Sequence, residues 1–360
     1  MYKERINYYD TLRTLAILGI ISTHVFQRWP NAAVLGINIY SFIEITRFAV
    51  PIFLMLSGAL LLNRPMTIKE FLKKRFPRLT YPFIFYMILY VVVLAILANA
   101  LVGFEGLYNF FQYVPFCYNW YFWMIAAVYL SIPIIDKFIQ NSNIKEIEYF
   151  VAICLIGSLF YQITYYFNIT HFINLNFFVG PLAYIVIGYY LSVKSFKYDN
   201  NKIVGFAFLI VILLTVLKIS GHLGLVPYHL LCNYEAAKSS IVFSYLDLGF
   251  IEMIRSMAFF ILFKYLYQSS SGVFSKVKKF LENKIILSFN QSVSKSSYGM
   301  YLFHHTLIEP LIIIAPQLIL TGTETALLIV LLSLAVFLIS WIVVLIINRI
   351  PIIKNFSGYH

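Results

Sequence analysis

The segment YYDTLRTLAILGIISTH, which begins at Tyr8, places three chemically active side chains in an otherwise apolar stretch. Asp10 and Arg13 lie near its start, and His24 ends it. An α-helix turns through about 1100° over eleven residues, so Arg13 and His24 would share one face, about 16 Å apart along the axis. Histidine has an ordinary pKa near neutrality, which suits a general base. The spacing favours a polar cleft that leads from Arg13 to a general base at His24.

A different interpretation of these residues stays open. Asp10 and Arg13 would then flank a membrane helix in the interface, and His24 would be an interior histidine with satisfied hydrogen bonds. Asp10 either pairs with Arg13 or helps to orient the polar face. Polar groups deep in a membrane are costly and mostly face protein or water, and their shared face therefore favours the cleft.

A basic segment, NRPMTIKEFLKKRFPRLTYPF, spans residues 63–83. Thr67 followed by Glu70 is a capping box, which predicts the start of a short interfacial helix. Lys74, Arg75 and Arg78 come next. The excess of basic residues in cytoplasmic loops would produce such a segment by itself. The alternative is an anion clamp, because planar guanidinium groups bind phosphate through paired hydrogen bonds.

The elements that must position these residues are membrane helices. The chain is 61% hydrophobic and 12% charged, whereas soluble proteins are about half apolar and a quarter charged. The apolar residues form continuous runs of about 20 residues, which suit a bilayer and exclude the alternating pattern of a β-barrel. We predict an all-α polytopic membrane protein with about ten transmembrane helices. They cover roughly residues 12–28, 42–62, 81–102, 120–138, 149–167, 176–193, 203–220, 244–266, 297–319 and 325–347.

The basic residues predict the orientation of these helices. Most of the 27 Lys and Arg fall in alternate connections, which places both termini in the cytoplasm. Basic residues at the inner leaflet meet anionic lipid headgroups, so the net charge of +12 does not indicate a nucleic-acid partner. No internal repeat or appended soluble segment is visible, and we expect one transmembrane domain over residues 1–360.

The three cysteines have no spacing typical of a metal site. Cys117, Cys154 and Cys232 lie far apart in the chain, so we expect no metal cofactor. A disulfide between Cys117 and Cys232 on the outer side is left open.

Five segments together match one membrane-enzyme pattern. They are YYDTLRTLAILGIISTH, VPIFLMLSGALLLNR (residues 50–64), Arg75-Phe-Pro-Arg78, NWYFWMIAAVYLSIPII and SVSKSSYGMYLFHHTLIEP. In this order they resemble the integral-membrane acyltransferases of acyltransferase family 3, from residue 8 to about 347. Many members carry His-x-Trp in the fourth helix, and some carry a Glu five residues after the Trp. Here Tyr118, Trp120 and Ile125 stand at those positions, which argues against a second His or a carboxylate there.

The resemblance implies an acyl-coenzyme A donor, most commonly acetyl-CoA, that enters from the cytoplasm. Its phosphates would contact Arg75 and Arg78, with Lys74 and Arg13 nearby. His24 would be the general base, or would carry the acyl group as an acyl-imidazole. The acceptor would be a hydroxyl of an extracytoplasmic polysaccharide or a lipid-linked sugar.

Several further residues are candidates for supporting roles. Ser57, Tyr301 and His304 would line the donor path, although a core histidine is an equally good interpretation of His304. Trp120 belongs to the tryptophan-rich fourth-helix segment. Glu44 either supports His24 or forms an i,i+3 ion pair with Arg47, and the ion pair is favoured. Glu252 and Arg255 are also i,i+3 neighbours and are expected to be structural.

A different class of function stays open beside the enzyme. Ten spans with buried polar groups would also suit a transporter that exports a glycan or a small molecule, although no inverted repeat is visible. Thermal stabilisation by acetyl-CoA would separate the two. In either case we expect a multi-pass protein of the plasma membrane, in a bacterium, with its oligomeric state left open.

Overall fold

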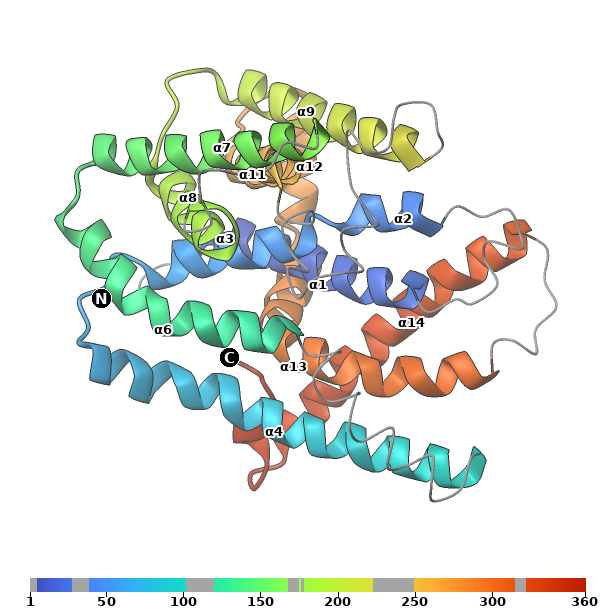
Figure 1. Cartoon of the computed structure of the whole chain (residues 1–360). Coiled ribbons are helices and arrows are strands. Elements are labelled where there is room, and N and C mark those ends of the chain that lie inside the picture. Colours follow the sequence, from blue (N-terminus) through green and yellow to red (C-terminus); the bar gives the residue numbers. More distant parts are fainter. Residues whose placement is uncertain are drawn as a thin grey trace. The chain divides into compact units, whose positions relative to one another are not determined.

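The computed structural model describes residues 5–27, 39–101, 120–167, 175, 178–222, 249–314 and 322–360. All the regular elements in these ranges are helices (Figure 1). They are α1 (Asn7–Gln27), α2 (Ile39–Thr46), α3 (Ala49–Leu61), α4 (Ile68–Leu101), α6 (Trp120–Asn141), α7 (Ile144–Tyr166), α8 (Pro181–Val193), α9 (Asn200–His222), α11 (Phe250–Leu266), α12 (Gly272–Leu281), α13 (Lys284–Ile314), α14 (Gly322–Arg349) and the short 3-10 helix η4 (Lys354–Phe356).

The helices of the described ranges fit a membrane protein. Six of these helical segments are long and apolar enough to cross a bilayer, and Pro181–Val193 is a shorter apolar helix. The predicted fold class, a polytopic helical membrane protein, is therefore confirmed. The total of ten spans and the cytoplasmic termini stay predictions, as does the single domain over residues 1–360. Cys117 and Cys232 lie outside the described residues, whereas Cys154 is a buried free thiol.

The chain forms two compact units. Unit 1 consists of Met1–Ala16, Tyr40–Pro65 and Ile134–Gln291. Unit 2 consists of Ile17–Ile39, Met66–Pro133 and Ser292–His360. Helices α1, α2, α6 and α13 contribute residues to both units.

In unit 1, helices α3 and α8 lie side by side at very short range (Figure 1). A Cβ atom on Gly58 would lie 1.8 Å from the carbonyl oxygen of Ile185, and one on Gly188 would lie 2.0 Å from that of Met55. Only glycine fits at both positions, because the two backbones touch directly. Small residues allow such close packing of membrane helices.

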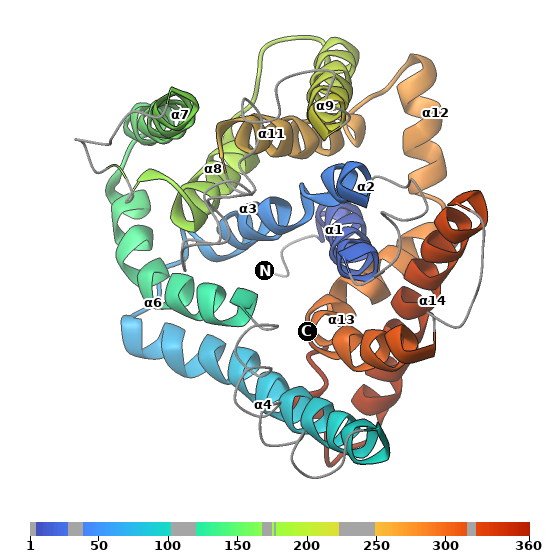
Figure 2. The ribbon, with the colours of Figure 1, turned by 45° about the vertical axis from the view of Figure 1, so that its right-hand side comes forward.

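A lysine of another helix, α11, bonds the backbone carbonyls at the C-terminal end of α8. Lys264 of α11 is 5% exposed, and its ammonium donates to the carbonyl oxygens of Leu191 and Lys194 at 2.7 Å and of Ser192 at 3.1 Å. The last carbonyls of a helix have no partner within the helix, and a cation placed there both bonds them and opposes the helix dipole. Helix α11 also packs against α9 (Figure 2).

The predicted span over residues 42–62 is divided into α2 and α3. Residues 47 and 48 form a turn between them. Pro51 has no N–H, so it cannot donate to the carbonyl of Arg47 as a continuous helix would require. The proline therefore accounts for the break.

In unit 2, the basic segment begins a long helix. The predicted capping box is present: the Glu70 carboxylate accepts from the backbone N–H of Thr67 at 2.8 Å, and the Glu70 N–H donates to the Thr67 hydroxyl at 3.2 Å. We expected a short helix that is separate from the third span, and this was wrong. Helix α4 runs without interruption from Ile68 to Leu101, through Pro77 and Pro82.

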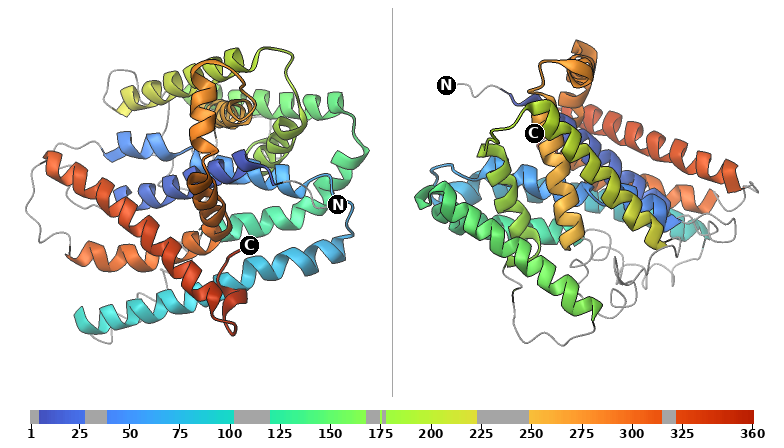
Figure 3. Two further views of the ribbon diagram at one scale, coloured as in Figure 1. Left: turned by 180° about the vertical axis from the view of Figure 1, so that it is seen from behind. Right: turned by 90° about the horizontal axis from the view of Figure 1, so that it is seen from above.

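A contact from the C-terminal segment helps to explain this continuity. Pro82 cannot donate to the carbonyl of Arg78, which lies four residues before it. Nε2 of His360 lies 3.1 Å from that oxygen and supplies the missing donor. The C-terminal segment, coloured red, lies beside α4 (Figure 3), and the buried Tyr86 of α4 donates to the carbonyl of Ser357 at 3.0 Å.

Candidate active site

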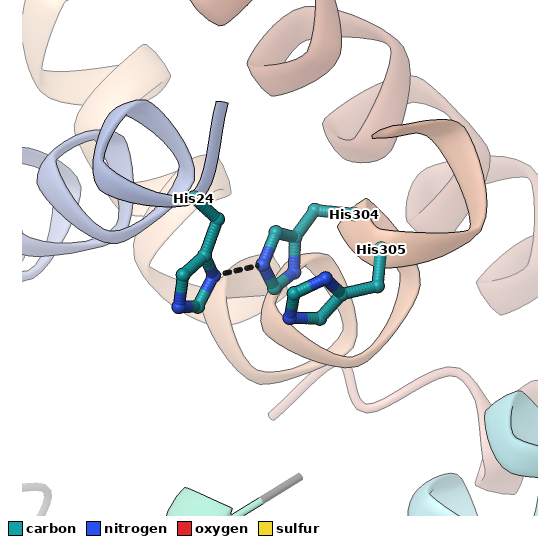
Figure 4. Close-up of side chains that lie close together, drawn as sticks. All are labelled: His24, His304 and His305. Carbon is teal, nitrogen blue, oxygen red and sulfur yellow. Dashed lines mark hydrogen bonds between the residues drawn. The ribbon is translucent and has the colours of Figure 1, made fainter. Parts of the chain in front are cut away.

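His24 and His304 meet inside unit 2. Nδ1 of His24, near the end of α1, lies 2.6 Å from Nε2 of His304 on α13 (Figure 4). The two rings are nearly parallel, at 12°, with centroids 4.9 Å apart. His304 is fully buried, and His24 is half-buried. Nδ1 of His304 lies 2.5 Å from the carbonyl oxygen of Tyr301, one turn earlier on the same helix.

These two contacts determine which nitrogen of each ring carries a proton. A carbonyl oxygen only accepts, so Nδ1 of His304 must be the donor. In a neutral ring Nε2 of His304 is then the acceptor, and Nδ1 of His24 must donate to it. The lone pair of the His24 ring is therefore on Nε2. This arrangement gives a neutral imidazole with one oriented basic nitrogen, as general-base or nucleophilic catalysis requires.

A third histidine belongs to the same group. His305 follows His304 on α13, and its ring centroid lies 4.6 Å from that of His24 and 4.1 Å from that of His304. We call His24, His304 and His305 the imidazole cluster. Sequence reasoning missed His305 as a candidate, although the His-His doublet beside the expected His304 was the available signal.

Aromatic and polar contacts hold α13 in place around this cluster. Tyr301, predicted to line the donor path, is buried against Tyr121 of α6 with ring centroids 5.1 Å apart. The hydroxyl of Tyr298 donates to the Leu79 carbonyl of α4 at 2.6 Å. Trp120 begins α6 and packs edge to face on Tyr121. A small pocket beside the cluster is lined by Phe83, Tyr86, Met87, Tyr90, Leu302 and His305.

The predicted anion-binding residues lie on the first part of α4, also in unit 2. Lys74 and Arg78 are exposed, and Arg75 is half-buried. The two arginines are three residues apart on one helix, so their side chains project from neighbouring positions on its surface. They can therefore act on the same anionic group.

The other predicted site residues belong to unit 1. Arg13 lies on α1, eleven residues before His24, and the cleft that would connect them stays a prediction. Asp10 is buried and accepts two hydrogen bonds from Arg5, at 2.6 and 2.8 Å. The hydroxyl of Ser57 donates to the Phe53 carbonyl of its own helix at 2.8 Å.

Glu44 takes part in a buried group of charged side chains in unit 1. We call this group the ion-pair cluster; it consists of Glu44, Arg47, Lys218, Glu252 and Arg255. The expected ion pair is present, with Arg47 Nε 2.7 Å from Glu44 Oε1. Arg255 donates to both oxygens of Glu252, at 3.1 and 2.7 Å. Lys218 bridges the two carboxylates, at 2.5 Å from Glu44 and 2.9 Å from Glu252.

Comparison with known proteins identifies the class of the molecule. A family model for acyltransferase family 3, described as an acyltransferase domain, matches residues 6–345 and therefore runs through both units. No curated protein and no solved structure matches the chain. The matched range contains the whole imidazole cluster and the basic start of α4. The chain belongs to acyltransferase family 3, and it is a membrane acyltransferase.

Proposed function

We propose that this protein transfers an acyl group, acetyl in the simplest case, from cytoplasmic acyl-coenzyme A to a hydroxyl of an extracytoplasmic polysaccharide or lipid-linked sugar. His24 is the general base. The observation that carries the proposal is the hydrogen bond from Nδ1 of His24 to Nε2 of the buried His304. It leaves the lone pair of His24 on Nε2, on a half-buried ring that a substrate can approach.

The proposed step needs only groups that this chain and the two substrates supply. Nε2 of His24 takes the proton of the acceptor hydroxyl while the hydroxyl oxygen attacks the thioester carbonyl carbon. The carbon–sulfur bond breaks, and the coenzyme A thiolate receives the proton from Nε2. The products are the ester and free coenzyme A, and the imidazole returns to its starting state.

The basic residues of α4 suit the donor's phosphates. Arg75 and Arg78, with Lys74 beside them, offer paired hydrogen bonds and positive charge to a phosphate group. Arg13 lies about 16 Å along α1 from His24, and an extended pantetheine arm has a similar length. The sequence spacing therefore matches a donor whose phosphates stay near the cytoplasm while its thioester reaches His24.

The experiment uses the purified chain in lipid nanodiscs with acetyl-CoA and measures release of free coenzyme A. Surface glycans of cells with and without the protein are compared by mass spectrometry to identify the acceptor through the mass of one added acyl group. Acetyl-CoA should also raise the Tm. No stabilisation at millimolar acetyl-CoA and no acylated glycan would contradict the proposal and favour a transporter.

Two variants test the donor site. With both Arg75→Ala and Arg78→Ala, we expect a KM for acetyl-CoA at least about tenfold higher with little change in kcat, because charge-assisted hydrogen bonds contribute about 1.5–3 kcal/mol each. The control is Lys279→Ala, which removes an exposed cation from α12 in unit 1. An equal rise in KM for the control would show a general charge effect and not a donor site.

A single-turnover experiment separates the two roles of His24. An acyl-imidazole would release one equivalent of coenzyme A before any acceptor is added. A general base would release none beyond slow hydrolysis, because the acceptor hydroxyl is the nucleophile.

A further inference from the structure

The imidazole cluster brings together a set of atoms that the proposed reaction does not fully use. One nitrogen from each of His24, His304 and His305 can be chosen so that all three lie within 4.8 Å of one another. The rings come from two helices that are far apart in the sequence, α1 and α13 (Figure 4). Transfer needs one basic nitrogen, on His24, and His305 has no part in it.

Three imidazoles in this arrangement are a donor set for a transition metal. Imidazole nitrogen suits Zn²⁺, Cu²⁺ and Ni²⁺, and three histidines with an open fourth position are a known ligand set for Zn²⁺. Zn–N bonds of about 2.0–2.1 Å with tetrahedral angles place ligand nitrogens about 3.3 Å apart. To reach this spacing, the nitrogens of His24 and His304 must separate from 2.6 Å, and the nitrogen of His305, now within 4.8 Å of them, must approach.

The surroundings already provide a second feature of metal sites. A metal-bound histidine usually donates its other N–H to a carbonyl or a carboxylate, which holds the ring in the required tautomer. Nδ1 of His304 has this partner in the Tyr301 carbonyl at 2.5 Å. The lone pair of His304 is therefore on Nε2, where a bound ion would replace the hydrogen bond from His24. A small pocket lies on the His305 side of the cluster, and the His24 ring is only half-buried.

We propose that His24, His304 and His305 bind one Zn²⁺-like ion, and that the bound ion blocks acyl transfer. A neutral imidazole has a single lone pair. When a metal takes the lone pair of His24, its other nitrogen carries the proton, and the ring has no basic site for the acceptor hydroxyl. The metal site stands on geometry alone, whereas the inhibition rests on the proposed function.

The binding test uses the full chain in nanodiscs after treatment with a chelator. Zn²⁺ is titrated in competition with a chromophoric chelator, and retained zinc is counted by elemental mass spectrometry. We expect one Zn²⁺ per chain. His305→Ala should weaken its affinity at least about 100-fold, since loss of an outer-shell partner alone costs 10–100-fold. His360→Ala, which removes a histidine outside the cluster, should leave the affinity unchanged.

Co²⁺ in place of Zn²⁺ gives an independent readout. Four-coordinate Co²⁺ has strong visible absorption bands, whereas those of six-coordinate Co²⁺ are much weaker. Such bands should appear with the unmodified chain and with His360→Ala, and should be absent with His305→Ala. Failure to bind Zn²⁺ with 1:1 stoichiometry, or equal affinity in His305→Ala, would overturn the metal site.

The activity measurement tests the second half of the proposal. Zn²⁺ should inhibit acyl transfer over the concentration range in which it binds, and a chelator should restore the rate. Compared with its own metal-free rate, the His305→Ala variant should show little or no inhibition at zinc concentrations that inhibit the unmodified chain. Zinc that stimulates transfer, or inhibits His305→Ala equally, would overturn the blocking role. Absence of transfer by the metal-free chain would count against the proposed function, and the binding test would still decide the metal site.

Discussion

The imidazole cluster of unit 2 and the ion-pair cluster of unit 1 are both polar groups inside an apolar molecule, but they are built differently. In the ion-pair cluster, charges are paired with charges, and Arg255 is completely buried against Glu252. In the imidazole cluster, His24 and His304 are joined as neutral rings by one hydrogen bond. Paired buried charges suit a structural role because breaking them is costly. A neutral base with one lone pair suits chemistry.

The largest expected effect is on catalysis, at His24. The His24→Ala variant should lose about 10²–10⁴-fold in acyl transfer, the usual contribution of a general base. Its Tm should change little, because the side chain is only half-buried. Coenzyme A release and a thermal melt measure the two quantities. Full activity in this variant would show that another group is the base.

The ion-pair cluster should show the opposite pattern. Arg255→Met leaves Glu252 without its bidentate partner, and breaking a buried ion pair costs about 3–5 kcal/mol. The Tm in detergent should fall strongly, while the donor KM of the protein that stays folded should be unchanged. Arg47→Met is the matched control, because that side chain is 20% exposed and its loss should be milder. An equal fall in Tm in Arg255→Met and Arg47→Met would contradict the view that the more deeply buried ion pair contributes more to stability.

A smaller effect is expected at His304, which acts as a positioning residue. His304→Ala should lower kcat about tenfold with the KM for acetyl-CoA unchanged, since one neutral hydrogen bond contributes about 0.5–1.5 kcal/mol. His304→Gln, whose amide oxygen can accept from Nδ1 of His24, should recover part of the rate. If His304→Ala lowers the Tm but does not lower kcat at an unchanged KM, His304 has a packing role only. The same conclusion follows if His304→Gln regains none of the rate.

The smallest effect is expected at a single neutral hydrogen bond of unit 2, between Tyr86 and Ser357. Tyr86→Phe removes the donor to the Ser357 carbonyl, which lies 3.0 Å away. The free energy of unfolding should fall by about 0.5–1.5 kcal/mol, well below the loss for Arg255→Met. Chemical or thermal unfolding of both variants under the same conditions makes the comparison. A loss as large as that of Arg255→Met would contradict the distinction between the clusters.

Features with a local signal were predictable from the sequence. The helix that carries Arg13 and His24, the capping box at Thr67 and the ion pair of Glu44 with Arg47 all depend on residues a few positions apart. Each follows from helix geometry and side-chain chemistry within one or two turns. The family followed from several such segments in order.

Features that depend on distant residues were not predictable. Proline at position 82 signals the end of a helix, yet α4 continues, and His360 from the other end of the chain bonds the Arg78 carbonyl that Pro82 leaves without a helical donor. The grouping of His305 with His24 likewise depends on the packing of α1 against α13. The bridging of Glu44 and Glu252 by Lys218 joins three helices that no sequence pattern connects.

The contact of Lys264 with the C-terminal carbonyls of α8 bears on how this short helix fits a bilayer. Thirteen residues of helix rise about 20 Å, less than the hydrocarbon thickness of about 30 Å. A helix this short would ordinarily leave bare carbonyls among lipid chains or force the membrane to thin. Lys264 donates to three carbonyls at this end of the helix, and α3 packs along α8. Protein groups therefore take the place of lipid around the short helix. A helix about two-thirds as long as the hydrocarbon layer is thick can end within the apolar region when another helix supplies donors to its last carbonyls.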